Sequence, residues 1–216
     1  MNDFDPKYNI IYYENLLKEF GFTSKSLGWN RDNQRLRFEI LLKNLNIAKI
    51  DSILDVGCGY GDLFFYLIDN NIAINKYIGL ELVNEFYIET KKRLKDFNNI
   101  NIFNIDFLDF NTPCDFIVGS GIFGVGNGMH ENMINYVDSI IKKSMDIATY
   151  GFSYNFLSSN SNIKSSNLNF HVDVNEISSV IRRYSPRFII DHSYSPFEFT
   201  VTVFCNKQYG ELLWYE

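Results

Sequence analysis

The chain has 216 residues, enough for one sizeable domain with a small cap and too few for two full domains. Apolar residues make up 46% of the sequence and aromatic residues 17%, so the chain can bury a large core and wholesale disorder is excluded. The formal net charge is −6 without a basic stripe, which makes the chain a poor candidate for binding nucleic acid, since that affinity rests largely on phosphate neutralisation.

The N-terminal part is predicted to form a helical cap. Apolar residues at helical spacing indicate one helix over 8–20, which Gly21 ends, and a second helix over 31–45. Two short amphipathic helices need a partner surface, so we do not expect the cap to be stable alone. We therefore divide the chain into a cap or lid, residues 1–50, and a main domain, residues 51–216.

The main domain is predicted to alternate between strands and helices. Strands are expected at 52–56, 77–81, 101–105, 114–119 and 151–156, with helices at 62–69, 84–97, 131–148 and 174–184. Two final strands, 187–191 and 197–205, are joined by a short connection, which indicates an antiparallel hairpin at one edge. This order predicts an α/β fold with a doubly wound, seven-stranded, mostly parallel sheet.

The most informative segment is a glycine-rich turn between the first predicted strand and the helix that follows it. The turn contains Gly57, Gly59 and Gly61, and Asp55 precedes them. Glycines let the backbone bend sharply and approach a ligand closely, and the start of a helix offers free N–H groups. Because open α/β sheets bind ligands at the carboxyl ends of their strands, the turn is in the expected place for a nucleotide-like cofactor.

The glycine spacing indicates which cofactor this is. The dinucleotide fingerprint is G-x-G-x-x-G, and here the third glycine, Gly61, comes one residue early. The D-x-G-x-G-x-G pattern resembles motif I of the class I S-adenosylmethionine-dependent methyltransferases. The resemblance implies their Rossmann-like fold and S-adenosylmethionine as the cofactor, bound by the main domain. An acid beside the turn suits a cofactor that carries an ammonium and a sulfonium.

Acids on later strand ends agree with the resemblance. Glu81 ends the second predicted strand, where an acid can accept hydrogen bonds from both ribose hydroxyls. Asp106 matches the family's acceptor for the adenine amino group, and Phe107 beside it can flank the ring. The cofactor-binding residues expected on this basis are Asp55, Gly57, Cys58, Gly59, Gly61, Asp62, Leu63, Glu81, Leu82, Asp106, Phe107, Gly119, Ser120 and Gly121.

Other segments resemble a group of small bacterial methyltransferases of the same class, so the match runs nearly end to end. These are residues 26–29 with Gln34, Arg37 and Phe38, then residues 119–123 and 198–201. In the cap, Trp29 is a candidate for stacking on the cofactor and Arg37 for pairing with its carboxylate. The candidates for binding the acceptor are Tyr13, Asn155, Tyr154 and Arg31. Core packing or a solvated helix face is the alternative for each of them.

Few residues are candidates for a general base, because the chain has three histidines. His130 starts a predicted helix, whose dipole favours a neutral imidazole. His192 and Tyr194 follow the sixth predicted strand on the cofactor side. Our catalytic candidates are His130, His192 and Tyr194, and ordinary packing or a surface role is the alternative for each. The third histidine, His171, is a weaker candidate. Three widely spaced cysteines without a Cys-x-x-Cys motif indicate neither a metal site nor a disulfide framework.

We therefore predict methyl transfer from S-adenosylmethionine to a small-molecule acceptor by in-line displacement. A sugar, a phosphoryl compound or a natural-product intermediate, methylated on oxygen or nitrogen, is compatible with this prediction. The alternatives are a non-catalytic cofactor-binding protein of the same fold and a nucleotide-dependent dehydrogenase, against which the glycine spacing argues. Without a signal peptide or an apolar run of about 20 residues, we expect a cytoplasmic monomer or homodimer with no membrane or nucleic-acid partner.

Overall fold

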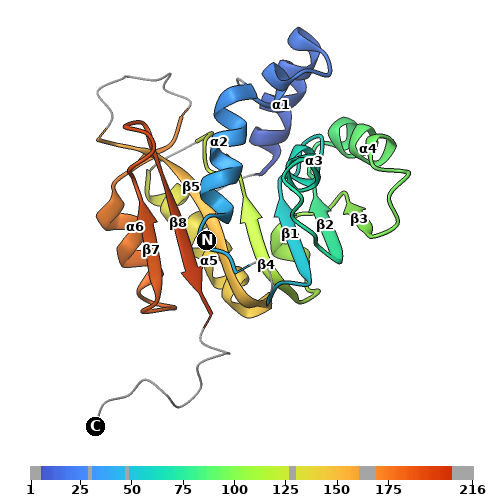
Figure 1. Cartoon of the computed structure of the whole chain (residues 1–216). Helices are drawn as coiled ribbons and strands as arrows, with labels where there is room; N and C mark the ends of the chain where they lie inside the picture. The colour runs from blue at the N-terminus through green and yellow to red at the C-terminus, as the bar shows by residue number, and fades with distance from the viewer. Residues whose placement is uncertain (1–5, 29–30, 47–48, 127–129, 161–168, 206–216) are drawn as a thin grey trace.

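A mixed sheet between two layers of helices forms the body of the computed structural model, which describes residues 6–28, 31–46, 49–126, 130–160 and 169–205 (Figure 1). The strands are β1 (Ser52–Val56), β2 (Lys76–Leu80), β3 (Ile100–Phe103), β4 (Cys114–Gly119), β5 (Ala148–Ser158), β6 (His171–Val172), β7 (Phe188–Asp191) and β8 (Glu198–Phe204). The helices are α1 (Pro6–Phe20), α2 (Arg31–Leu42), α3 (Asp62–Asp69), α4 (Asn84–Arg93), α5 (His130–Ile147) and α6 (Val174–Ile181), with the 3-10 turns η1 (Ser24–Leu27) and η3 (Phe107–Asp109).

The strand order is β3-β2-β1-β4-β5-β8-β7, and the short β6 pairs with β5. β1 lies in the middle of the parallel part, where Leu54 is opposite Ile78 of β2 and Ile117 of β4. β8 runs antiparallel to both β5 and β7, which confirms the predicted C-terminal hairpin and puts it at one edge. After β3 the chain crosses to β4 on the other side of β1, so the topological switch point lies between β1 and β4. The carboxyl ends of these two strands form the crevice where such sheets bind ligands.

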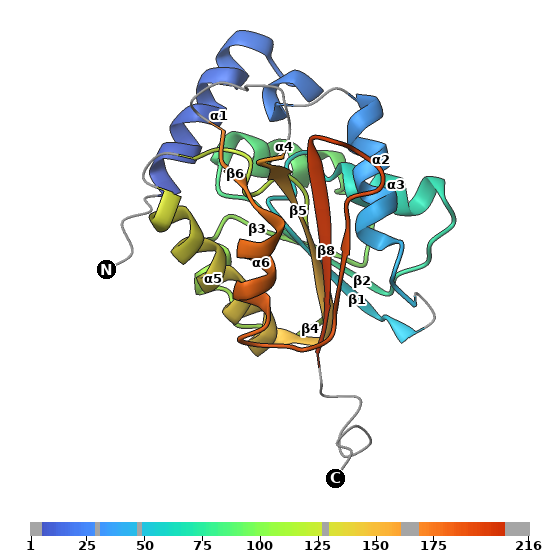
Figure 2. The same cartoon turned by 90° about the vertical axis from the view of Figure 1, so that its left-hand side faces the viewer.

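Alternate residues of the central strands face two separate cores. On β1, Ile53 faces α2 and α3, and Leu54 faces α5 and α6. Figure 2 shows these two helix pairs on opposite sides of the sheet. The doubly wound α/β fold expected from the sequence is therefore confirmed, and burial on both faces explains why its strands are runs of apolar residues.

The two cap helices occupy different places. α2 buries Phe38, Leu41 and Leu42 in the same core as the α3 side chains, and its end is tied to β7 by an ion pair of 2.8 Å between Lys43 Nζ and Asp191. α1 lies beyond the carboxyl ends of the parallel strands (Figure 1), and its Tyr13 packs on a cluster outside both cores. A domain boundary at residue 50 stays a prediction. Of the cap elements, α2 packs in one of the two cores, whereas α1 and η1 pack together outside both cores.

Several boundaries differ from expectation for local reasons. β5 begins at Ala148, directly after α5 and earlier than expected. No loop residue separates the two elements, so the sequence shows no break where the helix ends. β6 has two residues, too few for a periodic signal. α4 ends at Arg93, four residues earlier than expected, and the next residue, Leu94, is buried under the glycine turn.

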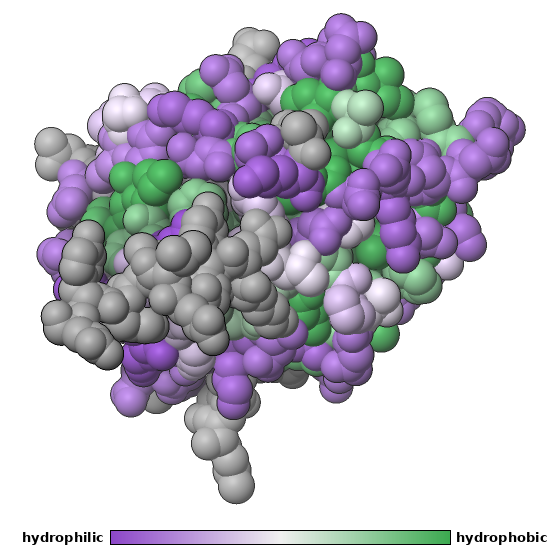
Figure 3. All heavy atoms as spheres, turned by 60° about the horizontal axis from the view of Figure 1, so that its bottom comes forward, coloured by the Kyte–Doolittle hydropathy of each residue, from purple (hydrophilic) through white to green (hydrophobic). Residues whose placement is uncertain are grey.

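Figure 3 shows the lower side of the molecule as drawn in Figure 1, where hydrophilic residues surround several apolar areas. None of the described helices combines the length and the apolar composition of a membrane span.

Candidate functional site

The turn after β1 requires glycine for two reasons. Gly57 and Gly59 have φ of 68° and 54°, in the left-handed region that other residues rarely adopt. A Cβ atom would lie 3.0 Å from the Ile122 side chain at Gly57 and 3.1 Å from Leu27 at Gly59. The turn therefore passes close to η1 on one side and to the segment after β4 on the other.

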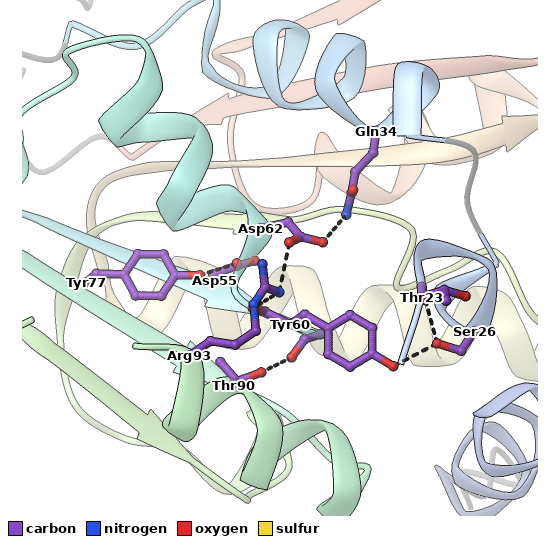
Figure 4. Close-up of polar contacts among 10 residues, drawn as sticks. Thr23, Ser26, Gln34, Asp55, Tyr60, Asp62, Tyr77, Thr90 and Arg93 are labelled. Atoms are coloured by element: carbon purple, nitrogen blue, oxygen red, sulfur yellow. Dashed lines mark hydrogen bonds and ion pairs between the residues drawn. The ribbon is translucent and has the colours of Figure 1, made fainter. Parts of the chain in front are cut away.

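Neighbouring elements hold this turn in place (Figure 4). From α4, Thr90 donates a hydrogen bond to the Gly59 carbonyl, and Arg93 Nη1 donates to the Tyr60 carbonyl at 2.6 Å. From η1, Ser26 shares a hydrogen bond of 2.7 Å with the Tyr60 hydroxyl. Hydrogen bonds thus fasten the glycine turn to α4 and to η1.

Glu81, directly after β2, is joined to the glycine turn. Its carboxylate accepts the N–H of Gly59 at 2.8 Å and the N–H of Val83 at 2.8 Å. Only 7% of the residue is exposed. Burial raises the pKa of Glu81 to about 6, and the backbone hydrogen bonds oppose that rise.

A second buried acid, Asp55, lies under the turn. Its carboxylate accepts a hydrogen bond of 2.5 Å from the Tyr77 hydroxyl on β2. Burial raises the pKa of Asp55 to about 7, although the Tyr77 hydrogen bond favours the ionised form and the nearby charge of Glu81 adds to the rise. Two carboxyls that are hard to ionise therefore share this region, which favours a cationic ligand.

The turn and both acids line one cavity, whose empty space is about 1030 Å³ when the solvent at its open side is counted. Its floor comes from the strand ends and its cover from α1, η1 and α2. The lining residues are Asn9, Ile10, Tyr13, Leu27, Gln34, Phe38, Asp55, Val56, Gly57, Cys58, Gly59, Leu80, Glu81, Leu82, Val83, Phe86, Ile105, Asp106, Phe107, Ser120, Gly121, Ile122, Val125 and Tyr136.

Most of the expected cofactor-binding residues meet in this cavity. Those that line it are Asp55, Gly57, Cys58, Gly59, Glu81, Leu82, Asp106, Phe107, Ser120 and Gly121, together with Tyr13 from the acceptor candidates. Asp106 also accepts the Leu108 N–H at 2.8 Å, which caps η3 and fixes the carboxylate at the end of β3. The sequence thus identified the acids and the turn that the fold brings together.

Other expected cofactor residues lie next to the turn without lining the cavity. Gly61 caps α3, and Leu63 is buried in the core under that helix. Asp62 points the other way, to Arg93 at 3.0 Å and to Gln34 at 3.4 Å (Figure 4). Gly119, the last residue of β4, is covered by Tyr154 and Ile122.

Arg37 was expected at the cofactor, and it does not line the cavity. Arg37 is buried and donates from Nε to Glu198 at 2.6 Å, so its charge is directed at β8 and not at the cofactor cavity. A buried guanidinium pairs with the carboxylate beside it because leaving either charge alone is costly. The side chain of Arg31 and the whole of Trp29 lie outside the described residues.

The two acceptor candidates on β5 have packing roles instead. Tyr154 is buried, and its hydroxyl shares a hydrogen bond of 2.7 Å with Ser144 on α5. Asn155 is also buried, and its Oδ1 accepts the Gly121 N–H at 2.7 Å. Asn155 therefore contacts the cavity wall from behind.

None of the three catalytic candidates lines the cavity. His130 is half-exposed, and its Nε2 lies 2.8 Å from Glu176 Oε1 on α6. His192 packs edge-on against the Phe199 ring, and the Tyr194 hydroxyl lies 2.9 Å from Thr200 Oγ1. The C-terminal hairpin turns these last two side chains toward β8, and the described cavity lining contains no histidine.

The sequence predicted the cap as a lid, and Tyr13 of the cap lines the cavity, but Asn9 and Ile10 were not identified. Asn9 and Ile10 on α1 showed only helical spacing, which marks a buried face without saying what that face covers. The buried oxygens Asn9 Oδ1 and Ser120 Oγ have no hydrogen-bond partner among the described residues. Because buried polar atoms are normally paired, these two favour a polar ligand in the cavity.

Comparisons with known proteins add to this geometry. The family model for mycolic acid cyclopropane synthetase matches residues 7–180. The curated protein "Putative methyltransferase Rv1506c" of Mycobacterium tuberculosis is 27% identical over 165 residues, which are 75% of this chain and 98% of that protein.

Two solved structures show a similar fold. Magnesium protoporphyrin IX methyltransferase (ChlM) from Synechocystis PCC 6803 with bound SAH has a TM-score of 0.64 at 9% identity, covering 94% of this chain and 97% of that chain. A SAM-dependent methyltransferase from Aquifex aeolicus has a TM-score of 0.59 at 14% identity, covering 94% and 99%. At these identities the two structures establish a shared fold.

Proposed function

The chain belongs to the mycolic acid cyclopropane synthetase family of class I S-adenosylmethionine-dependent methyltransferases, and we propose that its acceptor is a small molecule held under α1. S-adenosylmethionine is the cofactor, and methyl transfer is the reaction. One observation carries the proposal for the site: the glycine turn and the buried acids Asp55 and Glu81 line one cavity that α1 and η1 cover.

The residues of the cavity fit this cofactor. Asp55 and Glu81 are buried carboxyls that a cationic ligand stabilises in the ionised form. In the proposed site Glu81 would hold the ribose hydroxyls and Asp106 the adenine amino group. The unpaired oxygens Asn9 Oδ1 and Ser120 Oγ leave acceptors for further polar groups. When bound, S-adenosylmethionine supplies a methyl group on a sulfonium.

The chain's own contribution is positioning and the exclusion of water. Tyr13 and Leu27 cover the cavity, with Leu27 next to the glycine turn, and Ile122 and Val125 close it from the β4 side. Apolar walls of this kind shield an in-line displacement from solvent and hold the nucleophile near the methyl group. This predicts that loosening α1 lowers turnover.

The lining also favours one kind of nucleophile. Three acids in the described lining, Asp55, Glu81 and Asp106, are assigned to the cofactor in the proposed site. The rest of the described lining has no histidine, lysine or arginine, and burial raises the pKa of Tyr13 and of Tyr136 well above the usual range. These hydroxyls therefore stay protonated at neutral pH and can orient an acceptor without removing its proton. A neutral amine, which carries a free lone pair, fits this lining better than an alcohol. Arg37, which pairs with Glu198 and does not line the cavity, gives an anionic acceptor no support.

The test has two parts. Calorimetric titration with S-adenosylmethionine and with NAD should show saturable binding of the first alone. A panel of small amines, alcohols, sugars and phosphorylated compounds is then screened for formation of S-adenosylhomocysteine, and we expect turnover among the amines. Binding without turnover across the whole panel would favour a non-catalytic cofactor-binding protein. A cytoplasmic location and a monomeric or dimeric state stay predictions from the sequence.

A further inference from the structure

A buried ion pair joins α2 to the start of β8 behind the cavity. Arg37 and Glu198 have side chains that are 8% and 9% exposed, and Arg37 Nε donates to Glu198 Oε2 at 2.6 Å. A buried ion pair contributes little net stability compared with apolar residues of the same shape, because both charges lose their hydration. The location of this pair therefore needs an explanation other than stability.

The pair is connected to the β4 side of the cavity through Asn155. The Gly121 N–H can only donate, so Asn155 must present Oδ1 to it, at 2.7 Å. The amide nitrogen Nδ2 then points to Glu198 Oε2, at 3.4 Å. A carboxylate is the acceptor that this nitrogen needs, so Glu198 fixes the amide in the orientation that holds Gly121.

The same pair also holds the α2 side of the cavity. Gln34 and Phe38 on α2 line the cavity, and Arg37 lies one helical turn after the first and next to the second. Residues three or four apart share a helix face, so Arg37 fixes the turn of α2 that presents both side chains. Phe38 is also packed in the core between α2 and the sheet.

We propose that Arg37, Glu198 and Asn155 form one positioning unit that sets the distance between α2 and the segment 119–123 across the cavity. None of the three lines the cavity, so they act through Gln34, Phe38 and Gly121 and are not catalytic residues. The expected effect on ligand affinity rests on the proposed function, whereas the positioning unit itself rests on these contacts alone.

Coupling between two residues that do not touch provides the test. Arg37→Met and Asn155→Ala are made singly and together, and affinity for S-adenosylhomocysteine is measured by calorimetry. We expect each single change to weaken binding about tenfold, and the double variant to be within about twofold of the weaker single variant, because both changes break the same unit.

Lys43→Met is the matched control. Lys43 also ties α2 to the sheet, through Asp191, but it has no contact with the Asn155 unit. In the double variant, the fold-losses of affinity caused by Lys43→Met and by Asn155→Ala should multiply. If Arg37→Met leaves Glu198 unpaired and prevents folding, Arg37→Met with Glu198→Gln removes the buried charge, and the same comparison is made with it.

Hydrogen exchange supplies a readout that does not depend on a ligand. Asn155→Ala and Arg37→Met should each accelerate exchange of the segment 119–126 about tenfold, and Ser153→Ala, on the same strand and bonded to Thr202, should not. Multiplicative effects of Arg37→Met and Asn155→Ala, or unchanged exchange of this segment, would overturn the proposal. Absence of all cofactor binding by the unaltered protein would instead refute the proposed function. The hydrogen-exchange result would then decide alone whether the positioning unit exists.

Discussion

Glu81 accepts a hydrogen bond from the backbone N–H of Gly59, with 2.8 Å between Oε2 and N. The acid after β2 and the glycine turn after β1 therefore form one unit before any ligand enters. The second oxygen of Glu81 accepts the Val83 N–H, so the carboxylate is held in a fixed orientation at the wall of the cavity. A preorganised carboxylate binds ribose hydroxyls with less loss of conformational entropy.

Glu81→Ala should weaken S-adenosylmethionine binding by about 1–3 kcal/mol, since it removes charged hydrogen bonds to the ribose and leaves the Gly59 N–H unpaired. Glu81→Gln, which keeps an acceptor for that N–H, should lose less. Calorimetry on both variants measures this. Glu89→Gln is the control, because Glu89 pairs with Lys92 on the surface of α4 and lies outside the cavity. Equal affinity in all variants would remove Glu81 from the site.

Gly59→Val should abolish cofactor binding and leave the fold intact. The substitution puts a branched side chain at a φ of 54°, with Leu27 3.1 Å from the new Cβ. Gly21→Val separates the effect of backbone strain from that of the contact with Leu27. Gly21 also has a positive φ, 61°, but its Cβ would meet nothing within 4 Å. Binding is followed by calorimetry and folding by circular dichroism. Normal binding by the Gly59 variant would refute the assignment of the turn.

Cofactor affinity should fall as the pH is lowered from 8 to 5.5. Burial raises the pKa of Asp55 to about 7 and that of Glu81 to about 6, so both become protonated over this range and lose their attraction for a cation. We expect affinity for S-adenosylmethionine to fall about tenfold or more. S-adenosylhomocysteine, which lacks the sulfonium charge, should show a smaller decrease. Identical pH profiles for the two ligands would contradict this account.

Asp55→Asn should stabilise the unliganded protein at pH 8. A carboxyl whose folded pKa is raised favours folding when it is protonated, and that contribution is lost as the pH rises from about 4 through about 7. The neutral amide avoids the buried charge and still accepts from the Tyr77 hydroxyl, so the free energy of unfolding should rise by about 1–3 kcal/mol at pH 8. Urea unfolding at pH 8 and at pH 4.5 measures the gain, which should vanish at the lower pH. A loss of stability at pH 8 would show that Asp55 supports the fold.

His130→Ala and His192→Ala should change turnover by less than about twofold once an acceptor is known. Both side chains lie outside the cavity, with His130 against Glu176 and His192 against the Phe199 ring. Single-turnover rates for the two variants and for the unaltered chain make the comparison. A loss of a hundredfold or more in either variant, in the range of a missing general base, would place that histidine at the reacting atoms.

The fold was predictable because local patterns and the global architecture agree. Apolar runs such as residues 52–56, separated by amphipathic helices, leave few arrangements other than a doubly wound sheet. The glycine turn and the acids Asp55, Glu81 and Asp106 were predictable for a similar reason: each follows a strand, and parallel strands end at the same edge.

The remaining parts of the site depend on contacts that no local pattern shows. Arg37 and Glu198 are 161 residues apart, and nothing near either residue indicates that they pair. Helical spacing on α1 showed a buried face, but only the fold puts Asn9 over the cavity. The histidines were selected for their chemistry, and the directions of their side chains depend on how the C-terminal hairpin and α5 pack.

A crystal structure with S-adenosylhomocysteine tests the central claim most directly. The account predicts the adenosine between Glu81 and Asp106, with the amino-acid part along the Gly57–Gly59 turn and the sulfur facing the segment after β4. Density for the ligand in another part of the molecule, or a cavity that stays empty at saturating ligand, would contradict it.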